Sequence, residues 1–381
     1  MKHTISWGIV PFFCLLASVV CVAQEGIRLL DISNETARHT IIAQGTPTLY
    51  QGHPYSAMMP DGETVFCVWC VGHGGPAGPM AKSTDGGKTW ARWDSHLPEG
   101  YAKHRNCPSI YRLVNADGEA FLWVFSAQPR MARIVSADDG ETWEEKAPLG
   151  IPNVMAFSTI IPKNPGVQDG QYLGFYHHRA IPGGVVFDGE PRGDKSARLE
   201  VMVAETSDAG FTWSAPRLVA SVEGKDPCEP CAFWSPDKSE IAVLMRENRG
   251  TGRALVTFSR DKGATWDAPK NTSWELTGHR HIGTYLPDGR LFFAFRDTAP
   301  NSPTRGSFVG WVGSYDDVKN SQPGDVRILL LRNHAGWDCG YPGVFVTKDQ
   351  DIVALTYLKY DDSPNKHSVV ATRFRMEDLR K

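Results

Sequence analysis

Four residues of the chain have side chains that together could handle a negatively charged substrate. Arg246 and Arg296 each follow an apolar run, and two guanidinium groups can hold one carboxylate through paired hydrogen bonds. Tyr341 and Glu229 complement them, because a carboxylate can take the phenol proton and leave a nucleophile that an anionic substrate repels less. Structural roles compete with this interpretation: each arginine could pair with the acidic residue that follows it, and a buried tyrosine could serve packing.

Six short turns would position these side chains. They are centred on Asp61, Asp117, Asp169, Asp237, Asp288 and Asp349. Alternating apolar residues follow each turn, which predicts six β-hairpins. Helical periodicity is nearly absent, and the 37 Gly and 26 Pro would interrupt long helices. Units of about 60 residues suit the four-stranded blades of a β-propeller.

The hairpins predict which residues meet at one face of such a propeller. The first strand of a blade begins near the central axis, so residues about eight before and about eight after each turn should return to that face. The first set is His53, residues 105–107, Asn153, Glu229, His281 and Tyr341. The second set is Cys70, Ser126, His177, Arg246, Arg296 and Leu358. The abundance of His, Arg, Glu and Tyr indicates a polar pocket suited to an anionic ligand.

Four segments share the pattern Ser/Thr-x-Asp-x-Gly-x-Thr-Trp. They are residues 83–90, 136–143, 206–213 and 259–266, spaced by 53, 70 and 53 residues. The aspartate can bond amides of its own turn, the glycine accepts a positive φ, and the tryptophan ring folds back under the loop. The pattern therefore predicts a self-contained turn between two strands.

These four segments resemble the Asp-box of the sialidase (neuraminidase) superfamily, and the match in spacing runs from about Tyr50 to about Tyr360. The resemblance implies an all-β fold, a six-bladed β-propeller of four-stranded antiparallel blades. Each box would lie on the outer turn between the third and fourth strands. The resemblance also implies that Arg246 and Arg296 bind the carboxylate of sialic acid. Tyr341 would then attack the anomeric carbon, and Glu229 would activate Tyr341.

Two groups that the family carries in its first blade are missing here. In place of Arg-Ile-Pro the chain has Gln-Gly-His-Pro at residues 51–54, and the loop of residues 72–78 lacks the acid/base aspartate. His53 and His73 occupy these two places. An imidazole can act as an acid or base near neutral pH and, when protonated, can pair with a carboxylate. Each histidine could equally have a structural role.

Further candidates could supply the missing groups. Arg105 and His281 could provide positive charge for substrate binding, and Asp338 is the nearest spare carboxylate to Tyr341. The sequence shows no nucleotide-binding loop, redox-cofactor motif or ordered metal site, so we expect no cofactor; a structural calcium ion stays open. The balance of 40 Lys and Arg against 43 Asp and Glu excludes the basic excess that nucleic-acid binding requires.

The cysteines favour structural thiols or a disulfide of unknown pairing over a metal site. Six remain after residue 23, including two C-x-x-C pairs. Cys67 and Cys70 lie in an apparent strand, where residues three apart point to opposite faces and cannot share one ion.

The N-terminus predicts export. Lys2 and His3 precede an apolar run at residues 9–20, and a small residue, Ala23, ends the segment. This pattern is typical of a signal peptide covering residues 1–23, with lipidation at Cys21 as the less favoured alternative. The rest, residues 24–381, would form one propeller domain that is secreted or periplasmic, and no later segment is long and apolar enough to span a membrane.

These observations predict an exo-α-sialidase with an atypical active site that acts on glycoproteins and mucin-type glycans. The partners would be sialylated or other anionic oligosaccharides, while the oligomeric state stays open. One alternative is an exo-glycosidase for a uronic or 3-deoxy-2-ulosonic acid with a His-centred mechanism. Another is a propeller that binds acidic glycans without catalysis.

Overall fold

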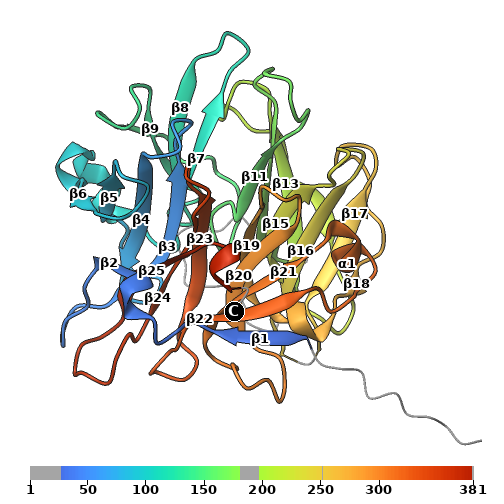
Figure 1. The fold of residues 1–381 in the computed structure, drawn as a ribbon. Helices are drawn as coiled ribbons and strands as arrows, with labels where there is room; N and C mark the ends of the chain where they lie inside the picture. Colours follow the sequence, from blue (N-terminus) through green and yellow to red (C-terminus); the bar gives the residue numbers. More distant parts are fainter. Residues whose placement is uncertain (1–26, 181–196, 251, 380–381) are drawn as a thin grey trace, which may run out of the picture.

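Each of the six Asp-centred turns joins the first and second strands of a four-stranded antiparallel sheet. The computed structural model describes residues 27–180, 197–250 and 252–379, which form a six-bladed β-propeller (Figure 1). This confirms the predicted fold class. The predicted signal peptide, residues 1–23, lies outside the described residues. No described helix is long and apolar enough to cross a membrane.

The strands follow one another blade by blade. The first blade holds β3 (Gln51–Met58), β4 (Val65–Val71), β5 (Met80–Ser83) and β6 (Ala91–Arg92). The second holds β7 (Ser109–Val114), β8 (Ala120–Ser126), β9 (Ala132–Ser136) and β10 (Glu144–Lys146). The third holds β11 (Thr159–Pro162), β12 (Tyr172–Arg179), β13 (Leu199–Thr206) and β14 (Arg217–Ala220). The fourth holds β15 (Pro227–Trp234), β16 (Ile241–Glu247), β17 (Leu255–Ser259) and β18 (Lys270–Asn271).

The last two blades include strands from the N-terminal segment. The fifth holds β19 (Gly278–Tyr285), β20 (Leu291–Asp297), β21 (Phe308–Gly313) and β22 (Val326–Leu331), and β1 (Arg28–Asp31) adds a parallel fifth strand beside β22. The sixth holds β23 (Gly340–Val346), β24 (Ile352–Leu358), β25 (Ser368–Phe374) and, at its outer edge, β2 (His39–Ala43). In Figure 1 blue β2 accordingly lies beside red β25.

The helices of the described residues are short, and they lie between strands or, in the case of η5, after the last strand. The 3-10 turns are η1 (Thr36–Arg38), η2 (Asp94–His96), η3 (Glu99–Lys103), η4 (Trp274–Leu276) and η5 (Glu377–Leu379). The α-helix α1 (Tyr315–Lys319) joins β21 to β22, where the fifth blade has no Asp-box. Ser314 caps it by accepting a hydrogen bond from the backbone N–H of Asp317 at 3.1 Å.

The four Asp-boxes lie between the third and fourth strands of blades one to four, as predicted. In the second blade Asp138 accepts hydrogen bonds from the Ser136 hydroxyl at 2.7 Å and the Thr142 hydroxyl at 2.6 Å. The indole N–H of Trp143 donates to the carbonyl of Gly140 at 3.0 Å, which folds the ring under the turn. Hydrogen bonds, first from Thr142, lower the pKa of Asp138 to about 2.

Candidate active site

The first strands of four blades carry a left-handed residue in a bulge near the start of the strand, and in the second blade a left-handed residue lies just before β7. These residues are His53, Cys107, Glu229, Arg280 and Tyr341, with φ between 41° and 56°. Residues other than glycine seldom adopt this conformation, and it clusters at functional sites. His53, Cys107, Glu229 and Tyr341 line one central cavity of about 190 Å³. The guanidinium of Arg280 lies 5.2 Å from the centroid of the Tyr341 ring.

Tyr341, Glu229 and Arg246 form one half of this site. The Tyr341 hydroxyl donates to Oε1 of Glu229 at 2.6 Å, and Nη1 of Arg246 donates to the same oxygen at 2.9 Å. Burial opposes ionisation of Glu229, but the charge of Arg246 holds its pKa well below the usual range. Burial, and then the charge of Glu229, raises the pKa of Tyr341. At neutral pH the site therefore holds an ionised Glu229 carboxylate that accepts a hydrogen bond from the neutral Tyr341 phenol.

His177, in β12, supports Glu229 from the third blade. Its Nδ1 accepts a hydrogen bond from the backbone N–H of Glu229 at 3.3 Å. Burial lowers the pKa of His177 to about 3, so the ring is neutral and can accept this bond.

His53 is buried beside Tyr341. Its Nδ1 accepts a hydrogen bond from the backbone N–H of Gly74 at 3.2 Å, which places the proton of the neutral ring on Nε2. Burial, and then the charge of His73, lowers the pKa of His53 well below its usual value. The ring centroids of His53 and Tyr341 lie 4.4 Å apart. His53 thus occupies the first-blade position as a neutral ring and does not supply positive charge at neutral pH.

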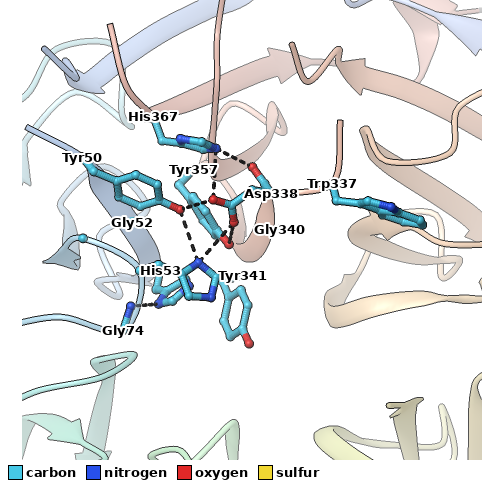
Figure 2. A network of polar contacts seen from close by, with 12 residues as sticks. Tyr50, Gly52, His53, Gly74, Trp337, Asp338, Gly340, Tyr341, Tyr357 and His367 are labelled. Atoms are coloured by element: carbon cyan, nitrogen blue, oxygen red, sulfur yellow. Dashed lines mark hydrogen bonds and ion pairs between the residues drawn. The ribbon is translucent and has the colours of Figure 1, made fainter. Parts of the chain in front are cut away.

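His73 and Asp338 form the other half of the site. Nδ1 of His73 lies 3.2 Å from Oδ1 of Asp338, and the His73 side chain is 57% exposed. The hydroxyls of Tyr50 and Tyr357 donate to the Asp338 carboxylate at 2.8 and 2.9 Å. Nε2 of His367 lies 3.3 Å from Oδ2 of Asp338. Figure 2 shows Asp338 among Tyr50, Tyr357 and His367, with the Tyr341 hydroxyl pointing away.

This network keeps Asp338 ionised. Partial burial raises its pKa, but hydrogen bonds, first from His73 and then from Tyr50, lower the pKa by more. The carboxylate holds Nδ1 of the exposed His73 ring and leaves Nε2 for other contacts. An aspartate that orients a histidine in this way is suited to acid and base chemistry.

Arg296 lies outside the central cavity. It lines an adjoining cavity of about 320 Å³, whereas Arg246 lines the central one. Arg296 donates to the carbonyl of Trp337 and contacts Nδ1 of His279. Burial, and then the charges of Arg246 and Arg296, lowers the pKa of His279, so a neutral ring stands near both arginines. The two guanidinium groups therefore serve neighbouring cavities.

The side chains of Arg105 and His281 lie in neither cavity, which corrects their predicted placement. The backbone of Arg105 bridges Pro76 and Gln128, and its side chain is exposed. Nε2 of His281 lies 2.8 Å from the carbonyl of Leu276, and the His281 ring is fully buried. For His281 the bulge in β19 explains the difference between prediction and structure. It gives the inner position to Arg280 and turns His281 to the core.

All six described cysteines are buried free thiols. Cys107 and Cys70 lie 3.2 and 3.5 Å from Nδ1 of His53, so two of these thiols pack against the site. The described residues contain no disulfide, and they contain no group of His, Cys, Asp and Glu that could hold a metal ion.

Comparison with known proteins identifies the family. Residues 101–354 match the family model of the BNR repeat-like domain. The chain belongs to this family. No curated protein sequence matches it.

Solved structures show the same BNR propeller fold. A protein of unknown function from Dyadobacter fermentans is 16% identical, with a TM-score of 0.65 over 88% of this chain and 97% of that one. A mutant NanB sialidase from Streptococcus pneumoniae is 13% identical, with a TM-score of 0.55 over 90% of this chain and 71% of that one. A Hadza microbial sialidase is 15% identical, with a TM-score of 0.53 over 87% and 66%. At these identities the likeness establishes the propeller fold alone.

Proposed function

We propose that this BNR propeller is an exported exo-α-sialidase that releases terminal sialic acid from glycoproteins and mucin-type glycans. The observation that supports this most is the 2.6 Å hydrogen bond from the Tyr341 hydroxyl to the buried Glu229 carboxylate. A phenol beside an ionised carboxylate is a nucleophile with its base in place. Arg246, which donates to Glu229 at 2.9 Å, keeps positive charge at the cavity for an anionic sugar.

In the first half of the reaction Tyr341 would displace the glycan. Its oxygen bonds to the anomeric carbon while its proton passes to Glu229, and the bond from the anomeric carbon to the leaving oxygen breaks. His73, protonated and oriented by Asp338, would give its Nε2 proton to that oxygen. The tyrosine replaces a carboxylate nucleophile, so the attack on an anionic sugar meets less repulsion.

In the second half water would restore the enzyme. Neutral His73 takes a proton from the water as the water oxygen bonds to the anomeric carbon. The bond from that carbon to the Tyr341 oxygen breaks, and Glu229 returns the proton to Tyr341. Two displacements at one carbon give net retention of configuration.

Replacement of the nucleophile tests this proposal. Tyr341→Phe keeps the ring but removes the hydroxyl, so release of a chromogenic sialoside should fall on the order of 10³-fold. Tyr360→Phe is the control, since Tyr360 lies in no part of the central cavity and its hydroxyl contacts His39 at 2.9 Å. The assay uses the mature protein and also identifies by mass the monosaccharide released from sialylated mucin. Full activity of Tyr341→Phe would exclude the assigned role.

A different acidic sugar is the second candidate. It is favoured by His53, which stands where the sialidase pattern has an arginine, because this site then lacks one of the groups by which that pattern holds sialic acid. A screen of the acids released from several anionic glycans separates a sialidase from an enzyme for uronic or 3-deoxy-2-ulosonic acids. Binding of these glycans without release, at every pH from about 4 to 8, would identify a non-catalytic propeller.

A further inference from the structure

Two segments contribute residues to both the adjoining cavity and the central one. At the end of β16, Arg246 faces the central cavity and Glu247 the adjoining one, as the alternation of side chains along a strand requires. Trp337, just before β23, lines the adjoining cavity, and Tyr341, in β23, lines the central one. Figure 2 shows the Trp337 ring turned away from the Asp338 network. The two cavities therefore lie on either side of the end of β16.

The volumes of the two cavities indicate how much of a glycan each one could hold. The central cavity, about 190 Å³, is below the range of about 300 to 1,000 Å³ that is usual for ligand pockets. The adjoining cavity, about 320 Å³, is within it. The central cavity alone can enclose only the reacting end of an oligosaccharide, and the adjoining one has room for a further sugar.

Trp337 and Arg305 form an unusual pair at this adjoining cavity. The Trp337 side chain is 47% exposed, although large aromatic residues are normally buried. The Arg305 guanidinium lies 4.6 Å from the centroid of the Trp337 ring, a cation–π contact that holds the guanidinium in place. The Arg296 guanidinium lies 6.0 Å from the same centroid. The Trp337 ring beside the two arginines offers an apolar surface together with hydrogen-bond donors for an anion.

The charges that line the adjoining cavity favour an anionic ligand. Two arginines, Arg296 and Arg305, supply positive charge. Glu247 is the one carboxylate among the described residues that line it, and it accepts hydrogen bonds from the backbone N–H groups of Asp226 at 3.2 Å and Arg249 at 3.0 Å. The remaining titratable group, His279, is neutral. The cavity thus has net positive charge.

We propose that the adjoining cavity binds the sugar on the leaving-group side of the cleaved bond and selects a sugar that carries a sulfate or a carboxylate. Arg305 would pair with the anionic group through two parallel hydrogen bonds, and Trp337 would cover an apolar face of the sugar ring. This inference rests on the proposed function in one respect, because the terminal acidic sugar must occupy the central cavity.

The test compares three sialyl-oligosaccharides that differ only in the sugar next to the terminal residue, which is neutral, sulfated or carboxylated. Wild-type protein should show a kcat/KM about tenfold or more higher for an anionic form than for the neutral one. In Arg305→Gln this ratio should fall towards one. In Trp337→Ala the kcat/KM for all three should fall relative to that for an aryl monosaccharide, which lacks the second sugar.

Arg253→Gln and Trp274→Ala are matched controls. Trp274 is 39% exposed and Arg253 lies 4.9 Å from its ring centroid, yet neither residue lines the adjoining cavity. Both controls should keep the wild-type ratios. Gly252→Phe gives a second, independent variant, because a Cβ at this cavity-lining glycine meets no atom of the described part of the chain within 4 Å and the ring would fill the cavity.

The outcomes separate this inference from the proposed function. Release of the terminal acid at equal rates from the three oligosaccharides overturns the inference and leaves the sialidase proposal intact. An equal loss on the aryl monosaccharide in Arg305→Gln would also overturn it, because the cavity would then hold part of the terminal sugar. If nothing is released from any substrate, calorimetric binding decides: tighter binding of an anionic form that depends on Arg305 supports the inference, and equal binding refutes it.

Discussion

Glu229 and Asp338 are both ionised, but their partners fit them for different steps. Glu229 accepts hydrogen bonds from a phenol and a guanidinium, so it can take the proton of a nucleophile. Asp338 contacts the exposed ring of His73, so its effect reaches the substrate through that histidine. Separate environments for two carboxylates are how one site runs acid and base chemistry together.

Substrates with different leaving groups test the role assigned to His73. In His73→Asn, release from a natural oligosaccharide should fall about 10²- to 10⁴-fold, because its leaving oxygen needs a proton. Release from an activated nitrophenyl sialoside should fall far less, since that leaving group departs without one. Asp338→Asn should give the same pattern in weaker form and should change the pH profile of kcat/KM. Rates on the two substrate types are the measurement.

A surface pair of the same chemistry provides the control. Nδ1 of His334 lies 2.8 Å from Oδ1 of Asp362, and neither residue lines the central cavity. His334→Asn and Asp362→Asn should leave both rates unchanged. Equal losses on both substrates in His73→Asn would rule out proton donation and point to a role in binding.

At the scale of elements, the Asp-boxes stabilise the outer edges of the blades. Asp138→Ala removes hydrogen bonds from Ser136 and Thr142 and should lower the free energy of unfolding by about 1 to 2 kcal/mol, because the turn is exposed and water replaces part of what is lost. Asp117→Ala, in the turn between β7 and β8 of the same blade, is the control. Urea denaturation measures both, and equal effects would contradict the role of the box.

The contribution of Asp138 should depend on pH. Its pKa is about 2 in the folded protein against 3.8 for an unperturbed aspartate. A group whose pKa is lowered by folding stabilises the folded state fully above its unfolded pKa and less as pH falls through its folded pKa. The difference in stability between wild type and Asp138→Asn should therefore be constant above about pH 5 and shrink between about pH 4 and 2. A difference that grows on acidification would contradict this.

Local chemistry explains why the strands and boxes could be predicted and some site residues could not. A turn such as residues 136–143 satisfies its own hydrogen bonds, so its sequence alone indicates its structure. The bulge that selects Arg280 over His281 depends on a left-handed residue without glycine, which no pattern marks. The network of Asp338 draws Tyr50, Tyr357 and His367 from separate segments, and only the closed fold brings them together.

Across the whole molecule, the propeller closes when β2 pairs with β25, because this places an N-terminal strand in the last blade. One face of β2 meets the core. Ile42 is 8% exposed within a cluster that also contains Val369 and Ala371, whereas the preceding Ile41 is 42% exposed. The closing contact therefore depends on one side of one short strand.

Substitutions on the two faces of β2 test this closure. Ile42→Ala should lower the free energy of unfolding by about 2 to 3 kcal/mol, since it removes buried apolar atoms and leaves a cavity. Ile41→Ala changes the same atoms on the exposed face and should cost less than about 0.5 kcal/mol. Urea denaturation of both variants measures the difference. Equal effects would show that β2 contributes little to closure.

The reactivity of the buried free thiols can be used to detect opening of the propeller. Each described cysteine is at most 3% exposed, so a thiol reagent in solution reaches them only when strands separate. They are distributed over blades one, two, four and the entry to blade six. The order in which they react would therefore map which blades open first. The thiols become reactive when the packing around them is lost.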